Sequence, residues 1–89
     1  MRRRLAYKIL YTKKALKYLE SLNRKEAQNV YRKIESIKEN PLHYIAKLSS
    51  VDIWKLGIGD YRAIIRLDRA KEELTIVDIG HRKNIYKNL

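Results

Sequence analysis

Four side chains whose chemistry suits a phosphodiester are spread over two short stretches of the sequence. The first stretch, Trp54–Asp68, has the pattern of two strands joined at a turn that contains glycine, and the second, His81–Tyr86, lies near the C-terminus. Guanidinium and ammonium groups bind phosphate oxygens and stabilise negative charge, and a phenol can accept or donate a proton. The candidate residues are Lys55, Arg62, Arg82 and Tyr86. Their types favour chemistry on a phosphate, with the other residues as the scaffold.

The first stretch predicts which way Arg62 points. In the strand-like run Tyr61–Leu67 the side chains alternate, so that apolar residues form one face while Arg62, Ile64 and Arg66 form the other. The basic face cannot be fully buried, because an unpaired guanidinium is costly to bury. For Arg66 we favour an ion pair across strands, with Asp68, Asp78 or Glu73 as the partner. For Arg62 we favour a functional role.

The C-terminal stretch offers a second guanidinium and the phenol. Arg82 follows Gly80-His81, where a strand should be ending. If the next residues are helical, Tyr86 lies one turn beyond Arg82 on the same side, and the two could contact one phosphate together. A terminal tyrosine that packs against a strand is the structural alternative, and the spacing alone does not decide between them.

Other kinds of site find little support in the sequence. The chain has no cysteine, and its two histidines, His43 and His81, stand 38 positions apart, so we expect no metal site. Gly57 and Gly59 bend a hairpin and do not open a helix, which argues against a dinucleotide-binding loop. Trp54 could stack on a base, but we expect it in the core of a small domain. We therefore expect no cofactor.

The charge of the chain favours an anionic partner. Its 89 residues include 21 Lys and Arg against 10 Asp and Glu, which gives a net charge of +11. Residues 1–45 hold 12 basic and 4 acidic side chains, so most of the positive charge lies outside the half with the candidate site. We interpret this charge as a docking surface for nucleic acid or an acidic protein. A surface that only keeps the protein soluble is the alternative.

The length and hydropathy of the chain predict a single domain, residues 1–89. A hydrophobic content of 45% supports a folded domain. No apolar run is long enough for a signal peptide or a membrane span. With no cysteine either, a cytoplasmic location is the simplest expectation.

Two short helices are predicted in the first half of the chain. Alternation over residues 5–11 indicates a strand, and Thr12 is predicted to cap the helix that follows it. Asn23, with Glu26 three residues later, resembles a capping box and opens a second helix, which Asn40-Pro41 should end. The apolar stripes consist of Ala15, Leu16, Leu19 and Leu22 in the first helix and Ala27, Val30, Tyr31, Ile34 and Ile37 in the second.

The second half of the chain predicts strands. Residues 42–51 are less regular and form either a short edge strand or a loop. Three strand-like runs with hairpin-length connections follow, which favours antiparallel pairing; they are Ile53–Leu56, Tyr61–Leu67 and Leu74–Ile79. The predicted fold is α+β, with a curved antiparallel sheet of about four strands packed on two N-terminal antiparallel helices (β-α-α-β-β-β) and a short C-terminal helix or tail from about Lys83.

Two motifs carry a resemblance to a known family. They are Gly59-Asp60-Tyr61-Arg62 and His81-Arg82-x-x-x-Tyr86, and together with the order of the elements they resemble the RelE/ParE superfamily of toxins, in particular its RelE-like mRNA interferase branch. Lys47-Leu48-Ser49-Ser50 stands where that family usually has K-L-x-G. The resemblance covers nearly the whole chain. It implies the toxin of a type II toxin–antitoxin system, inhibited by a cognate acidic, RelB-like antitoxin, with a heterotetramer of the two as one expected assembly.

For the RelE-like branch, the resemblance also implies a ribosome-dependent, metal-independent endoribonuclease that cleaves translated mRNA. The residues that it implies are Lys55, Arg62, Arg82 and Tyr86 for catalysis and Lys47, His81 and Lys83 for contacts with RNA. Tyr86 would be the general base, because nearby cations lower the pKa of a phenol. Arg62 would grip the phosphate with its planar fork, and Arg82 would stabilise charge on the phosphate or the leaving oxygen. Lys55 would share the proton transfer or stabilise the developing charge.

One departure from the family pattern leaves other functions open. Many members carry a further basic residue two positions before or after the matched lysine, where this chain has Ile53 and Gly57. A thinner cationic cluster suits two alternatives: a ParE-like toxin that inhibits DNA gyrase without nuclease chemistry, and a non-catalytic nucleic-acid-binding co-repressor. The combination of Arg62, Arg82 and Tyr86 favours the nuclease, because a protein that only binds has no need of it.

Overall fold

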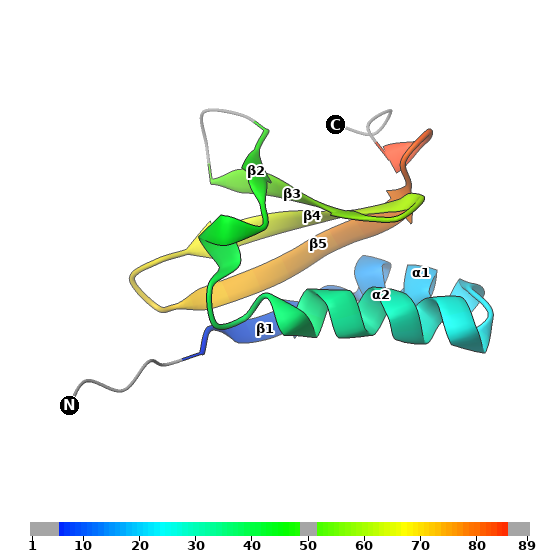
Figure 1. Cartoon of the computed structure of the whole chain (residues 1–89), viewed down its shortest axis with the longest axis horizontal. Helices are drawn as coiled ribbons and strands as arrows, with labels where there is room; N and C mark the ends of the chain where they lie inside the picture. Colours follow the sequence, from blue (N-terminus) through cyan, green and yellow to red (C-terminus); the bar gives the residue numbers. More distant parts are fainter. Residues whose placement is uncertain (1–5, 49–51, 86–89) are drawn as a thin grey trace.

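Two α-helices and five strands follow one another, in the order β-α-α-β-β-β-β, within residues 6–48 and 52–85, the part of the chain that the computed structural model describes (Figure 1). The helices are α1 (Lys13–Ser21) and α2 (Arg24–Ser36), and a short 3₁₀ helix, η1, spans Pro41–His43. The strands are β1 (Lys8–Tyr11), β2 (Ala46–Lys47), β3 (Ile53–Ile58), β4 (Tyr61–Asp68) and β5 (Glu73–His81). The predicted α+β class is confirmed.

The five strands form one sheet in the order β1-β5-β4-β3-β2. β3, β4 and β5 pair antiparallel through short turns, as predicted, and the two-residue β2 joins β3 as an antiparallel edge strand. β1 pairs with β5 in parallel, with Ile9 opposite Leu74. The sheet is therefore mixed, and the prediction of an antiparallel sheet was wrong for β1, because no hairpin connects β1 to its partner and fixes its direction. β2 is the short edge strand that residues 42–51 left open as one alternative.

α1 begins where β1 leaves the sheet, and Thr12 fixes that point. The Thr12 Oγ1 accepts a hydrogen bond from the Ala15 N–H (3.1 Å) and donates one to the Val77 carbonyl of β5 (2.8 Å). The predicted N-cap is thus confirmed, and the same side chain also links the start of α1 to β5. Both helices lie on one side of the sheet, below β5 in Figure 1. Neither of these described α-helices is long and apolar enough to cross a membrane.

The N-cap of α2 is also confirmed, with one difference in its reciprocal bond. Asn23 Oδ1 accepts a hydrogen bond from the Glu26 N–H (2.8 Å), as in a capping box. The Glu26 carboxylate accepts from the Asn23 side-chain amide (3.2 Å). α2 then ends at Ser36, before Asn40-Pro41, and Pro41 opens η1.

Replacing Asn23 by alanine should lower the free energy of unfolding by about 1 kcal/mol, within a range of roughly 0.5–2 kcal/mol, because the cap is lost. Asn29→Ala is the matched control, since Asn29 is exposed in the interior of the same helix, where alanine is favourable. Urea unfolding of the two variants measures the difference. Equal midpoints would show that the Asn23 cap contributes nothing to stability.

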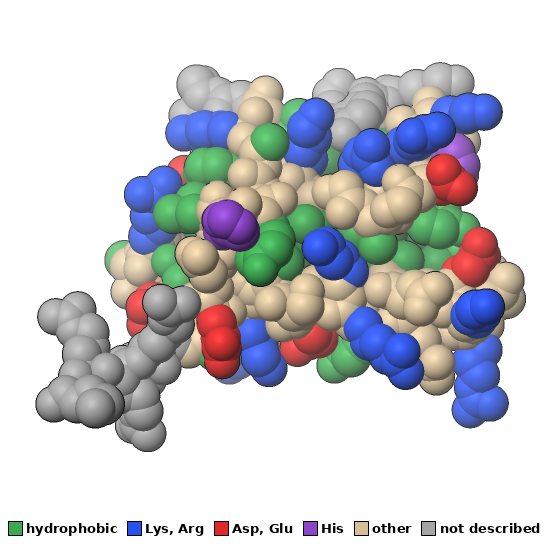
Figure 2. Space-filling view, in the orientation of Figure 1, with side chains coloured by type: hydrophobic (Ala, Val, Ile, Leu, Met, Phe, Trp, Pro, Cys, Tyr) green, Lys and Arg blue, Asp and Glu red, His purple; other side chains and the backbone are tan. Residues whose placement is uncertain are grey.

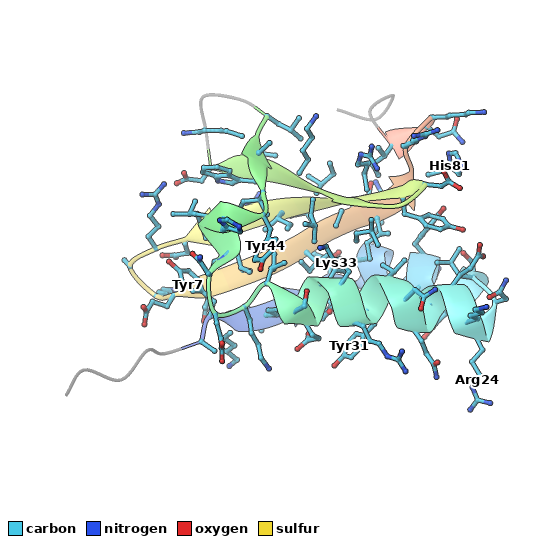
Figure 3. The ribbon with its side chains drawn as sticks, viewed as in Figure 1. Tyr7, Arg24, Tyr31, Lys33, Tyr44 and His81 are labelled. Atoms are coloured by element: carbon cyan, nitrogen blue, oxygen red, sulfur yellow. The ribbon has the colours of Figure 1, made fainter. Side chains whose placement is uncertain are left out.

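The main core lies between the helices and one face of the sheet. Its fully buried members include Val30 and Ile34 on α2 and Ile37 directly after it, and Trp54 of β3 belongs to the same cluster, as expected. Two residues of the predicted helical stripes are instead exposed: Leu16 (45%) and Tyr31 (49%). The Tyr31 ring lies on the lower side of α2 in Figure 3 and stacks on Tyr11, with 6.1 Å between the centroids.

Candidate active site

The sheet carries Lys55 and Arg62 on the face that is turned away from the main core, which we call the outer face. In the register of β3 and β4, Lys55 is opposite Ile64 and Gly57 is opposite Arg62. The two cationic residues are therefore diagonal neighbours on adjacent strands, a position that separates the backbones by about 7–8 Å, within reach of long side chains. This placement agrees with the alternation predicted for β4.

Arg62 is held against the turn that connects β3 to β4. Its Nη1 donates hydrogen bonds to the carbonyls of Gly59 (3.0 Å) and Tyr61 (2.8 Å). A guanidinium has five N–H donors in a planar fork, so these bonds engage one nitrogen and leave the fork able to contact a phosphate. The side chain is half-exposed, in agreement with a residue that can meet a ligand from solution.

Arg82 contacts the same turn from the end of β5. Its backbone N–H donates to the Asp60 carbonyl (2.8 Å), and its Nε lies 4.0 Å from Asp60 Oδ1. Residues 59–61 thus contact both arginines: Arg62 of β4 through hydrogen bonds from its guanidinium, and Arg82 after β5 through its backbone N–H and the longer approach of its Nε. Two arginines that stand 20 positions apart in sequence are brought together by this turn.

Tyr86 lies outside the described residues, and its proposed role stays a prediction. Its neighbour in sequence, Ile85, is buried (4% exposed). The Ile85 Cδ1 is 2.8 Å from the point where a Cβ on Gly80 would be, and Gly80 is opposite Arg62 in the register of β4 and β5. Ile85, the last described residue, therefore packs against Gly80, the β5 residue that is paired with Arg62.

The three residues predicted to contact RNA occupy different places. Lys47 is opposite Trp54, on the core face, with its ammonium 5.6 Å from the indole ring centroid. His81 is opposite Tyr61, and its Nδ1 accepts a hydrogen bond from the Lys83 N–H (3.2 Å). Lys83 is exposed in the turn that follows β5. The structure thus separates Lys47 from the outer face and leaves Lys83 next to Arg82.

The phenols beside this turn are held in their protonated form. Tyr18, Tyr61 and His81 make edge-to-face ring contacts, with centroids 6.2 Å and 5.9 Å apart. Desolvation raises the pKa of Tyr61, and the Glu26 carboxylate adds to the increase. Desolvation also raises the pKa of Tyr18. Neither phenol is therefore suited to serve as a base near neutral pH.

A groove of about 420 Å³ borders the site between α1 and the end of β5. Lys14 and Lys17 line its helix side, and Ile79 and Ile85 line its strand side. The Lys14 ammonium pairs with Asp78 (3.2 Å), one of the three acidic residues that the sequence suggested as partners of Arg66. Lysines and arginines also outnumber acidic residues over the face in Figure 2, on the helices as well as the sheet.

Two features of the site were not recognised from the sequence. The sequence assigns Asp60 no role beyond its place in the Gly59–Arg62 motif, although its carbonyl and carboxylate both contact Arg82. Gly57 stands where the family pattern has a further cation, and the Arg62 guanidinium lies beside it, with Cζ 3.5 Å from the point where a Cβ would be. The signal for Gly57 was available, because a glycine inside a strand often marks a close approach of another group.

Comparison with known proteins gives a family and a fold. Residues 9–86 match the model of the ParE toxin of type II toxin–antitoxin systems, parDE. No curated protein sequence matches the chain.

Three similar solved structures contain RelE toxins bound to antitoxins. They are the RelBE2 complex of Mycobacterium tuberculosis (TM-score 0.79, 21% identity, 88% of this chain and 100% of that chain), the archaeal RelE–RelB complex of Pyrococcus horikoshii OT3 (0.74, 17%, 90% and 99%) and the intact RelBE complex of E. coli (0.72, 21%, 85% and 96%). At these identities the likeness shows the fold. The match over residues 9–86 shows more: the chain belongs to the ParE toxin family of the RelE/ParE superfamily and is a toxin of a type II toxin–antitoxin system, with a fold like that of RelE.

Proposed function

We propose that this toxin is an endoribonuclease that cleaves mRNA on the ribosome. The observation that carries the proposal is the pair of arginines on one turn: the Arg62 guanidinium donates to the carbonyls of residues 59 and 61, and Arg82 contacts residue 60 through its backbone N–H and, at 4.0 Å, through its Nε. Lys55 stands on the same face as Arg62, one diagonal step away. A cluster of cations from three parts of the chain suits a substrate whose charge grows during the reaction.

In the proposed reaction, the 2′-oxygen of one nucleotide attacks the adjacent phosphorus while the bond from phosphorus to the 5′-oxygen breaks. The 2′-hydroxyl loses a proton to a base, for which we propose Tyr86, and the 5′-oxygen gains a proton as it leaves. The products are a 2′,3′-cyclic phosphate and a 5′-hydroxyl. Arg62 and Arg82 stabilise the negative charge on the phosphate oxygens, and Lys55 stabilises charge or supplies a proton.

We further propose that the toxin is inhibited by an acidic antitoxin. The solved structures with this fold include complexes of RelE with RelB. The chain has a net charge of +11, which favours association with an acidic protein. The groove beside α1 combines apolar walls with Lys14 and Lys17, so it fits an apolar side chain from an acidic segment.

Cleavage in a reconstituted translation reaction tests the proposed function. Purified toxin is added to ribosomes that translate a defined mRNA, and primer extension maps the new 5′ ends. We expect cuts at fixed positions relative to the codon in the ribosomal A site, and loss of these cuts when translation is blocked before elongation. Full-length mRNA after treatment with folded toxin would overturn the proposal.

Inhibition of DNA gyrase is the second candidate function, and the match of residues 9–86 to the ParE model favours it. A ParE-like toxin would need no phosphate chemistry and would act by binding a protein. A gyrase supercoiling assay with the same preparation separates the two functions. Linear DNA or loss of supercoiling, together with intact mRNA, would support the gyrase inhibitor.

A further inference from the structure

The Arg62 guanidinium lies against Gly57, which has no side chain to limit the room beside it. A Cβ added at Gly57 would be 3.5 Å from both Cζ and Nη1 of Arg62 and 3.7 Å from its Nε. The arginine guanidinium thus lies against the strand position opposite its own, in contact distance of a Cβ, so a larger side chain at residue 57 would compete with it for space. From this position its Nη1 reaches the carbonyls of Gly59 and Tyr61.

The backbone gives no other reason for glycine at this position. Among the described residues, the positive backbone φ angles belong to Gly59 (58°) and Glu72 (55°), so Gly57 has a φ that any residue could adopt. The register from Ile53–Arg66 to Ile58–Tyr61 runs without a bulge. Glycine inside a strand weakens the strand and often marks a place where another group approaches closely. At Gly57 that group is the guanidinium.

We propose that Gly57 is a positioning residue for Arg62, and this inference rests on the proposed ribonuclease function. With Nη1 held by two carbonyls, the guanidinium is ordered before RNA arrives. Less side-chain entropy is then lost when the phosphate binds, because the Arg62 guanidinium is already held in one position. Many members of the family carry a further basic residue near the matched lysine, whereas Gly57 in this chain leaves room for Arg62 on the neighbouring strand.

Substitutions of increasing size at Gly57 test the inference. Gly57→Val should lower the cleavage rate by about 10²-fold, because the valine methyl groups push the guanidinium off the two carbonyls. Gly57→Ala should lose only a few fold, because its Cβ is in ordinary contact with Cζ at 3.5 Å. Valine favours strands, so the larger variant should fold. Equal losses for alanine and valine would point to backbone flexibility and overturn the inference.

A second measurement does not depend on cleavage. Nitrogen-15 relaxation of the Arg62 Nε–H should show an ordered group in the wild-type protein and a mobile one in Gly57→Val. In the Arg62→Ala background, Gly57→Val should cause no further loss of cleavage. If the Arg62 Nε–H is equally ordered in the wild-type protein and in Gly57→Val, the inference is overturned. If the order changes as expected but the wild-type protein does not cleave mRNA, only the ribonuclease function is overturned.

Discussion

Replacing Arg62 by alanine is expected to lower the rate of mRNA cleavage by about 10²–10³-fold, the cost of removing one group that stabilises charge in a transition state. The protein should stay folded, because Arg62 is half-exposed and its hydrogen bonds reach carbonyls of the 59–61 turn. Such bonds contribute roughly 0.5–1.5 kcal/mol each. Single-turnover cleavage on programmed ribosomes measures the rate, and circular dichroism checks the fold.

Arg66→Ala is the matched control for this prediction. Arg66 lies on the same strand and the same outer face as Arg62, it is exposed, and its removal changes the net charge by the same amount. It is opposite Ile53 and away from the 59–61 turn, so its loss should leave cleavage unchanged. Arg62→Lys keeps the charge without the fork and should recover only part of the rate. If the two alanine variants lose activity equally, the effect is one of net charge and Arg62 has no special role.

Local signals in the sequence predicted much of this fold, because each depends on residues close together in the chain. The Thr12 and Asn23 caps involve partners three residues away, and both form as expected. Hairpin-length turns likewise predicted the antiparallel order of β3, β4 and β5. The parallel pairing of β1 with β5 is different in kind. It joins Lys8 to Glu73 across the whole domain, and no short-range pattern in the sequence sets its direction.

The candidate site shows the same division. Alternation along β4 correctly gave the face of Arg62, because the side-chain period of a strand is a local property. The contact of Arg82 with Asp60 depends on how β5 ends relative to the β3–β4 turn, which only the folded sheet determines. Helical spacing places Tyr31 in the apolar stripe of the second helix, yet its side chain is exposed and its ring stacks on Tyr11. The spacing of apolar residues identifies the apolar stripe of a helix, but it does not show how much of that stripe the neighbouring sheet buries.

Replacing Ile34 by alanine is expected to lower the free energy of unfolding by about 2–5 kcal/mol, the largest stability change that we predict. Ile34 is fully buried on α2 and belongs to the cluster between that helix and the sheet. Alanine would leave a cavity that neighbours in a packed core cannot fill. The total stability of a small domain is only about 5–15 kcal/mol. Each kcal/mol shifts the melting temperature by roughly 4–8 °C, so thermal unfolding should show the loss clearly.

Leu16→Ala is the control, because Leu16 is also an apolar residue on a helix but is 45% exposed. Its unfolding free energy should change by no more than about 0.5 kcal/mol, as for ordinary surface substitutions. The pair also separates the scaffold from the chemistry. Below its melting temperature, Ile34→Ala should cleave mRNA at close to the wild-type rate, since Ile34 lies on the core side of the sheet and the two arginines contact the 59–61 turn. A folded Ile34→Ala protein with the activity of Arg62→Ala would mean that the outer face depends on the packing of α2 and is not an independent site.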